Sequence, residues 1–153
     1  NGDTETYDCI LQLFRDSVTP QEELRYFAAL LEFRQVNLFD ATLELLLTEL
    51  RTQNAPFMLA SAMTHLDHGA RAWTFLKTNW DLLCDKFPQN SIPRMAGGIR
   101  AISDPALAAE IKEFFAQHPV PQGVLTIAQH LEKMEINVSL RSREGSSLGV
   151  TQN

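Results

Sequence analysis

The chain has 153 residues, of which 44% are hydrophobic and 21% are charged, and its formal net charge is −6. This length and composition fit one globular domain that buries its core without disulfides or metal ions. An acidic chain argues against nucleic acid and against an anionic membrane as main partners, because both require a basic surface. We therefore expect neither as a partner.

The sequence shows no membrane-spanning stretch and no signal peptide, so we expect a cytoplasmic location. The chain begins with Asn1 and lacks an initiator Met, which favours a piece of a longer protein. Cys9 and Cys84 are its only cysteines, and each lies within a helical pattern. We expect both thiols to be reduced and packed, because a free Cys behaves as a small buried hydrophobe.

Apolar residues repeat with the helical period along almost the whole chain, and alternation with period two is nearly absent, so we expect an all-α fold. A clear start signal is Thr19-Pro20-Gln21-Glu22, which combines a Thr N-cap, a first-turn Pro and the Glu of a capping box. The third helix opens at Asn37 or Asp40. The predicted helices span residues 4–16, 20–33, 37–50, 57–66, 70–87, 92–102, 105–118 and 122–140.

The helix predicted over residues 70–87 has the largest apolar stripe in the chain. Its members fall on one helical face and are Trp73, Leu76, Trp80, Leu83 and Phe87. Two indoles on one face bury a large apolar area, so we expect neighbouring helices to pack against them.

Gly97-Gly98 lies in the middle of the helix predicted over residues 92–102, at a cost of about 1 kcal/mol per Gly relative to Ala. Interior glycines usually have a packing reason, so close approach of a neighbouring backbone is favoured over a hinge. Residues 143–153 are polar and rich in Gly and Ser, and we expect a loose polar tail after a single helical domain of residues 1–142.

The starts of the odd-numbered and of the even-numbered predicted helices each advance by roughly 30–37 residues, the length of a helix-turn-helix repeat. We therefore expect about eight helices in stacked antiparallel pairs, forming a HEAT-like α-solenoid, an α-α superhelix. The alternative is a compact helical bundle.

His65, Asp67 and His68 form the only cluster of metal-ligating residue types. The two histidines share a helix face, but a zinc site needs a third ligand at a defined spacing, and none is present. A small metal-dependent hydrolase centred on His65 and His68 is therefore a weak hypothesis, and we assign no metal ligand.

The chain contains no H-E-x-x-H, P-loop, G-x-S-x-G or dinucleotide motif. Neither cysteine has a visible catalytic partner. Several helix carboxylates are expected to form a solvated face, and two further histidines are expected to be capping or surface residues. These residues are Glu110, Glu113, Glu132, Glu135, His118 and His130. We assign no catalytic and no cofactor-binding residue, so the fragment alone is not expected to be an enzyme.

One string is more specific than these patterns. Residues 72–83 read A-W-x-F-L-K-x-N-W-x-x-L and are followed by Lys86-Phe87. This string resembles a segment in the C-terminal domain of zinc aminopeptidases of the puromycin-sensitive, endoplasmic-reticulum and aminopeptidase N types. The similarity continues through Glu113-Phe114-Phe115, the T-x-x-Q-x-L-E of residues 126–132 and Asn137-Val138.

The resemblance implies an all-helical, HEAT-like domain that walls and gates the substrate chamber and can contact the far end of a peptide. The parent enzyme would release N-terminal residues from peptides. Its zinc and its catalytic residues would lie in an upstream domain that is absent here, so this fragment would hold no cofactor. The implied partners are the catalytic domain of the same parent chain and a peptide substrate.

Two positions depart from the family pattern. Leu125 stands where relatives often have a basic residue, and Leu140 stands where they commonly have an aromatic residue; we expect Leu140 to be packed. The alternative function is a free-standing α-solenoid that binds a peptide or a protein in its concave groove.

Overall fold

The structure is a computed structural model that describes residues 2–152, with side chains described up to residue 143. Within that part of the chain it contains nine α-helices, three short 3-10 helices and no strand, which confirms the all-α prediction. The α-helices are α1 (Gly2–Arg15), α2 (Pro20–Leu31), α3 (Val36–Thr48), α4 (Ala55–Ala62), α5 (Gly69–Thr78), α6 (Trp80–Lys86), α7 (Ile92–Met95), α8 (Pro105–Gln117) and α9 (Val124–Gln152). The 3-10 helices are η1 (Gln89–Ser91), η2 (Ala96–Ala101) and η3 (Pro121–Gly123).

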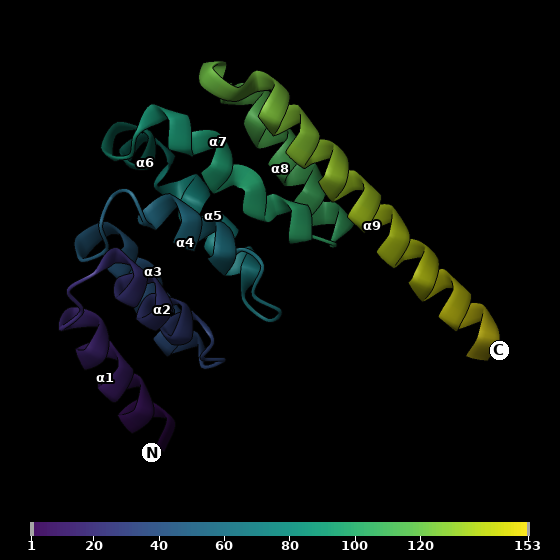
Figure 1. The fold of residues 1–153 in the computed structure, drawn as a ribbon. Helices are drawn as coiled ribbons and strands as arrows, with labels where there is room; N and C mark the ends of the chain where they lie inside the picture. Colours follow the sequence, from purple (N-terminus) through teal and green to yellow (C-terminus); the bar gives the residue numbers. More distant parts are fainter. Residues whose placement is uncertain (1, 153) are drawn as a thin grey trace.

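The helices are stacked in two layers that advance with the chain from α1 to α9 (Figure 1). The first layer comprises α1, α3, α5 with α6, and α8. The second layer comprises α2, α4, α7 with η2, and α9, in which each element packs on the next. Because α1 pairs with α2, α3 with α4, and α8 with α9, the expected stacking of helix pairs into an α-solenoid is observed.

Hydrogen bonds between the elements repeat the same spacing. Those that involve side chains join residues between 28 and 39 positions apart, such as Tyr7 to Thr42 and His130 to Pro93. A contact that recurs one repeat further along the chain is what nearest-neighbour stacking requires. The period expected from the helix starts is therefore present in the contacts.

The tryptophan stripe is buried as predicted, but it does not lie on one uninterrupted helix. The helix breaks at Asn79, whose φ and ψ are −103° and 15°, into α5 and α6. The side-chain amide of Asn79 donates to Phe75 O at 2.8 Å, and Asn side chains compete in this way with the helical ladder. Trp73, Leu76 and Leu83 are nevertheless fully buried.

Both indoles pack against α8, as expected for neighbours of this stripe. The rings of Trp73 and Trp80 each meet Phe114 edge to face, with centroids 5.2 Å apart. Trp73 Nε1 donates to Glu110 Oε2 at 2.6 Å, so the one polar atom of the buried indole is paired. α8 is thereby fixed to α5.

Gly98 explains how η2 lies against α4. A Cβ atom at this position would lie 2.3 Å from Ala60 O and 2.8 Å from Met63 Cβ. Only Gly allows the two backbones to approach so closely. The expected packing role is confirmed, while the helix predicted over residues 92–102 is corrected to a short α7 followed by the 3-10 turn of η2.

The signal at Thr19 is confirmed, since Thr19 Oγ1 accepts from Glu22 N at 3.1 Å. The start predicted for the third helix is wrong: α3 begins at Val36, one residue before Asn37, and the side chain of Gln35 at the N-cap makes no capping bond to the helix. Phe39 N donates to Gln35 O, so the backbone bond alone begins this helix.

Two helix ends also differ from the predictions. α4 ends at Ala62 rather than near residue 66, because His65 Nδ1 accepts from the amides of Asp67 and His68 and holds a tight loop there. α9 continues past Leu140 to Gln152, with no proline after residue 121 to end it. The division into residues 1–142 and a tail of residues 143–153 stays a prediction.

The two cysteines are free, but only one is packed. Cys84 is half-buried, and burial raises the pKa of its thiol. Cys9 is exposed, so the expectation of a packed thiol is wrong there, because it lies outside the buried face of α1 formed by Tyr7 and Phe14. Among the described residues, no helix has the length and apolarity needed to cross a membrane.

Candidate functional site

A line of basic side chains on the second layer is the first candidate site. It consists of Arg94 on α7 and Arg100 on η2, with Gly97 between them in the sequence, and is called the basic strip below. Residues three apart eclipse one another in a 3-10 helix, so Arg100 follows Gly97 on one face. Arg94 and Arg100 are both exposed. The strip thus presents two cations separated by a residue without a side chain.

An aromatic ring and an imidazole border the basic strip. The guanidinium of Arg94 lies over the ring of Phe57, 5.4 Å from its centroid, and Phe57 is 45% exposed. His130 Nε2 donates to Pro93 O at 2.9 Å, and a Cβ on Gly97 would lie only 3.3 Å from the His130 ring. The missing side chain of Gly97 therefore leaves room for α9 against η2.

The positive charge of the strip acts on the neighbouring imidazole of His130. Burial, and then the positive charge of Arg100, lower the pKa of His130, while the bond to Pro93 O acts in the opposite direction. Its Nδ1 is buried and has no hydrogen-bond partner in the described part of the chain. A neutral imidazole with Nε2 protonated satisfies these contacts best.

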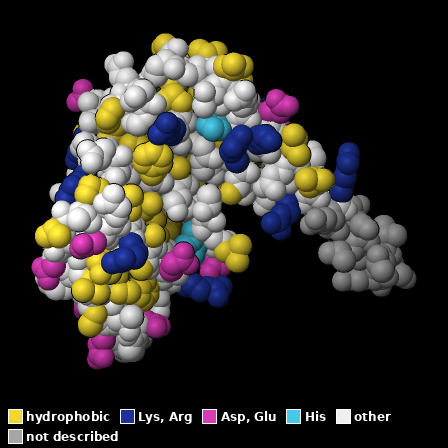
Figure 2. Space-filling model, in the orientation of Figure 1, with side chains coloured by type: hydrophobic (Ala, Val, Ile, Leu, Met, Phe, Trp, Pro, Cys, Tyr) yellow, Lys and Arg dark blue, Asp and Glu magenta, His cyan; other side chains and the backbone are white. Residues whose placement is uncertain are grey.

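Basic side chains gather on this face of the molecule, over α7 and α9 (Figure 2). Because the whole chain carries a net charge of −6, this gathering is a local departure from the average. Exposed guanidinium groups, one of them over an aromatic ring, suit carboxylates. The arrangement can bind and orient an anion.

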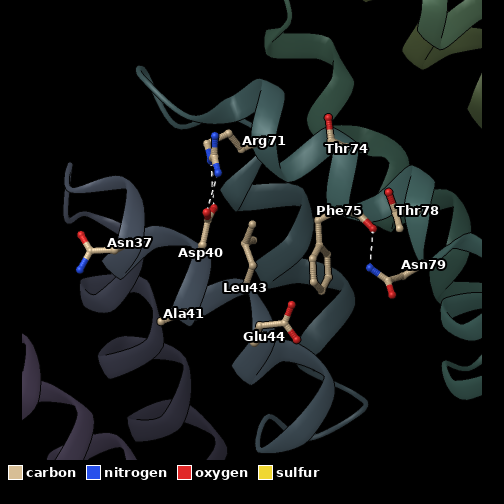
Figure 3. Close-up of a pocket in the computed structure, with 10 residues that line it drawn as sticks. All are labelled: Asn37, Asp40, Ala41, Leu43, Glu44, Arg71, Thr74, Phe75, Thr78 and Asn79. Carbon is tan, nitrogen blue, oxygen red and sulfur yellow. Dashed lines mark hydrogen bonds and ion pairs between the residues drawn. The ribbon is translucent and has the colours of Figure 1, made fainter.

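A groove of about 610 Å³ in the first layer is the second candidate site (Figure 3). It lies between α3 and α5, and it is called the α3–α5 groove below. Leu43 and Phe75 give it apolar lining. Arg71 crosses between the helices and binds both oxygens of Asp40, with Nε–Oδ1 at 2.9 Å and Nη2–Oδ2 at 2.5 Å. This guanidinium lowers the pKa of the Asp40 carboxyl.

The histidine cluster makes several contacts within the chain. His65 Nδ1 is occupied by two backbone amides, and His68 Nε2 lies 2.6 Å from Arg34 O. The two imidazoles stack with centroids 5.0 Å apart, and both contact the ring of Phe39. Within the described residues, no three His, Cys, Asp or Glu side chains are grouped to hold a metal ion. These contacts hold the loop after α4 in place.

Four carboxylates were expected on a solvated face, and some of them also contact other side chains. Glu110 is exposed, as predicted, but it also accepts the Trp73 indole proton and lies 3.6 Å from Lys77 Nζ. Glu113 accepts from Gln117, and Glu135 lies 3.5 Å from Lys112. Glu132 is exposed. Glu110 therefore has a structural role that the helical pattern did not indicate.

Of the other residues named from the sequence, some lie as expected and others do not. His118 caps α8 as expected, with Nδ1 2.9 Å from Phe114 O. His130 is not a simple surface residue, because it links α9 to α7. Leu140 is 52% exposed, so the expectation of a packed leucine is wrong. Leu125 is 72% exposed.

Sequence reasoning assigned no site residue and missed Arg94 and Arg100. The available signal was the three-residue spacing of Arg94, Gly97 and Arg100. On a regular α-helix this spacing would have turned the two arginines to different faces. The 3-10 geometry of η2 instead turns Arg100 onto the same face as Gly97.

Comparison with known proteins identifies the family of this all-α domain. Residues 1–136 match the family described as ERAP1-like C-terminal domain. The chain is 31% identical over 136 residues to "Aminopeptidase M1-C" of Oryza sativa subsp. japonica, which covers 86% of this chain and 15% of that relative. It is 28% identical over 134 residues to "Aminopeptidase M1-B" of the same organism, with the same coverage. For "Aminopeptidase M1" of Arabidopsis thaliana the identity is 24% over 143 residues, which covers 90% of this chain and 16% of the relative.

The chain is thus an all-α, solenoid-type domain of the kind found at the C-terminal part of M1 aminopeptidases. It belongs to the ERAP1-like C-terminal domain family. It spans only about 15% of the length of the curated relatives it matches.

Proposed function

We propose that the chain is the non-catalytic C-terminal domain of a zinc-dependent aminopeptidase that releases N-terminal residues from peptides. Its part would be to wall and gate the substrate chamber. The proposal is supported by the family match over residues 1–136 and by relatives that are named aminopeptidases and are several times longer than this chain. Zinc, which would polarise the scissile carbonyl, would be held by the parent's catalytic domain and not by residues of this chain.

The observation that carries the proposal is the basic strip beside an exposed aromatic ring. A peptide bound by its N-terminus at a distant catalytic centre ends in a carboxylate. Arg94 and Arg100 offer that carboxylate two guanidinium groups, and Phe57 offers apolar contact to the last side chain. We therefore propose that the second layer faces the chamber and that the basic strip attracts the far end of the substrate.

The gating part of the proposal follows from the stacking. Each element contacts its neighbours in the two layers, so small rotations at successive repeats add up over the length of the domain. A domain that opens and closes over a catalytic centre can set rates without taking part in the chemistry. The cytoplasmic location expected from the sequence stays a prediction.

The test is made on the full parent enzyme with Arg100→Glu. KM for a peptide of about ten residues with a free C-terminal carboxylate is expected to rise about threefold to tenfold, as for loss of a charge-assisted bond at a partly exposed site. KM for the same peptide with an amidated C-terminus is expected to rise less, because the amide carries no charge.

Arg25→Glu is the matched control, since Arg25 is an exposed arginine on α2 that contacts Tyr26 rather than the strip. It is expected to leave the ratio of the two KM values unchanged. An equal rise for both peptides in Arg100→Glu would contradict carboxylate recognition. A parent without any peptidase activity would contradict the function as a whole.

A further inference from the structure

The α3–α5 groove lies in the first layer, away from the basic strip in the second layer, and its lining suggests a ligand of its own. Its volume of about 610 Å³ is in the range of sites that hold small ligands or a few peptide residues. The Asp40–Arg71 pair is a bidentate link between α3 and α5, so the groove is held in shape without a ligand. A preformed groove lowers the cost of ordering on binding.

Glu44 gives the groove its charge. It lies one turn after Asp40 on α3, and in Figure 3 its carboxylate points toward the ring of Phe75. Asp40 is neutralised by Arg71, whereas the Glu44 carboxylate has no hydrogen bond or ion pair in the described part of the chain. An unpaired carboxylate beside an aromatic face attracts a cation through both a charge-assisted bond and a cation–π contact.

The other lining groups favour a peptide over a simple amine. Thr78 and Asn37 line the groove, and their side chains form no hydrogen bond in the described part of the chain. They can serve the N–H and C=O groups of a peptide backbone. Phe75 and Ala41 suit the aliphatic stem of an arginine or lysine and a neighbouring apolar side chain.

We propose that the α3–α5 groove binds a peptide segment of a separate protein in which an arginine or lysine is followed by an aliphatic residue. Glu44 binds the cation, Phe75 packs on its stem, and the exposed wall at Ala41 receives the aliphatic side chain. The choice of a separate protein rests on the proposed function, in which the second layer faces the catalytic domain and the first layer faces away. The groove would then be an outward docking site of the aminopeptidase.

The first experiment titrates the 153-residue chain with acetyl-Gly-Arg-Leu-Gly-amide and follows amide shifts by NMR. The expected result is saturable shifts in α3 and α5. The peptide with Gln in place of Arg is expected to bind about threefold to fivefold more weakly, as is the Arg peptide with Glu44→Gln. Glu132→Gln, which removes an exposed carboxylate from α9, is the matched control and is expected to leave binding unchanged.

Equal affinity for the Arg and Gln peptides, or shifts confined to the basic strip, would overturn the proposal. Ala41→Trp fills the groove without changing charge and is expected to abolish binding, since Ala41 is exposed on its wall. If the chain instead dimerises and Ala41→Trp makes it monomeric, the occupant is a second copy and the proposal fails.

The second experiment uses the full parent enzyme and the same Arg peptide carrying a fluorescent label. Fluorescence anisotropy is expected to give the affinity found for the 153-residue chain and the same loss with Glu44→Gln. Binding to the chain but not to the parent would mean that the parent's own residues cover the groove, which would overturn the choice of a separate partner. Loss of carboxylate recognition in Arg100→Glu leaves this binding untouched, so the two proposals fail separately.

Discussion

Both halves of the solenoid contain ring contacts, such as that of Phe14 with Phe27, but they differ in their ion pairs and in the size of their ring clusters. From α1 to α5, successive repeats are linked by ion pairs with N–O distances of 2.5 to 3.1 Å. From α5 onward, the ion pairs are longer, at 3.5 and 3.6 Å, and a connected cluster of five rings joins the repeats. The rings are those of Trp73, Trp80, Phe114, Phe115 and His118.

This difference implies different sensitivities. Ion pairs at the surface contribute little each and weaken with salt and with acid. Ring packing depends mainly on buried apolar area, so salt and acid affect it less. The N-terminal half therefore has bidentate pairs that fix geometry, such as Arg15 with Glu49, whereas we expect the ring cluster to contribute more to stability in the C-terminal half.

Among variants that compare the two halves, Trp73→Ala is expected to change the free energy of unfolding most. Trp73 is fully buried, and loss of a core tryptophan lowers the free energy of unfolding by about 3–5 kcal/mol. It also leaves Glu110 without the indole proton. Urea unfolding measures the change. Phe57→Ala removes a ring that is 45% exposed and serves as the control, with an expected loss below about 1 kcal/mol. Equal losses for the two variants would show that the aromatic cluster is not the main source of cohesion.

A smaller effect is expected from Glu23→Ala in the N-terminal half. Glu23 is 5% exposed and accepts from Arg51 N at 3.1 Å and Asn54 Nδ2 at 2.9 Å. Its loss leaves a buried amide unpaired, which lowers the free energy of unfolding by about 1–3 kcal/mol. Glu32→Ala, at an exposed carboxylate at the end of α2, is expected to change it by less than about 0.5 kcal/mol. Urea unfolding checks both, and a Glu23→Ala loss as large as that of Trp73→Ala would remove the contrast between the halves.

How far the sequence predicted these halves depends on the range of the interaction. Periodicity predicted all eight helical regions and the repeat, because each apolar stripe is a local pattern that stacking then buries. The stripe that includes Trp73 and Trp80 is buried for this reason. The break at Asn79 was missed because the competing bond to Phe75 O is satisfied within an otherwise helical pattern.

The candidate sites could not be predicted from the periodicity of the sequence. The face that Arg100 occupies depends on η2 being a 3-10 helix, and its six residues are too few for that period to be recognised in the sequence. Glu110 meets Trp73 from a position 37 residues away, and nothing in the pattern of α8 distinguishes it from Glu113. The α3–α5 groove exists because the side chains of two neighbouring helices leave space between them, which periodicity does not encode.

The smallest effect sharpens the comparison through pH. Arg71 and Arg15 lower the pKa of Asp40 and of Glu49, chiefly by hydrogen bonding. A carboxyl whose pKa is lowered on folding contributes stability above its unfolded pKa, about 4, and loses that contribution as the pH falls through its folded pKa. The free energy of unfolding is therefore expected to fall as the pH is lowered below about 4.

The variant D40N/E49Q tests this contribution by urea unfolding at pH 7 and pH 3. Both carboxylates are about one-third or more exposed, so each pair is expected to contribute only about 0.2–1 kcal/mol at pH 7. The difference between the variant and the parent chain is expected to vanish at pH 3 and to shrink in about 1 M salt, where the Debye length is about 3 Å. The variant E113Q/E132Q, which removes two exposed carboxylates of α8 and α9, controls for net charge and is expected to show no such pH-dependent difference. A difference that persists at pH 3 would mean that Asp40 and Glu49 act through packing, and the N-terminal joints would then resemble the aromatic ones more than their geometry suggests.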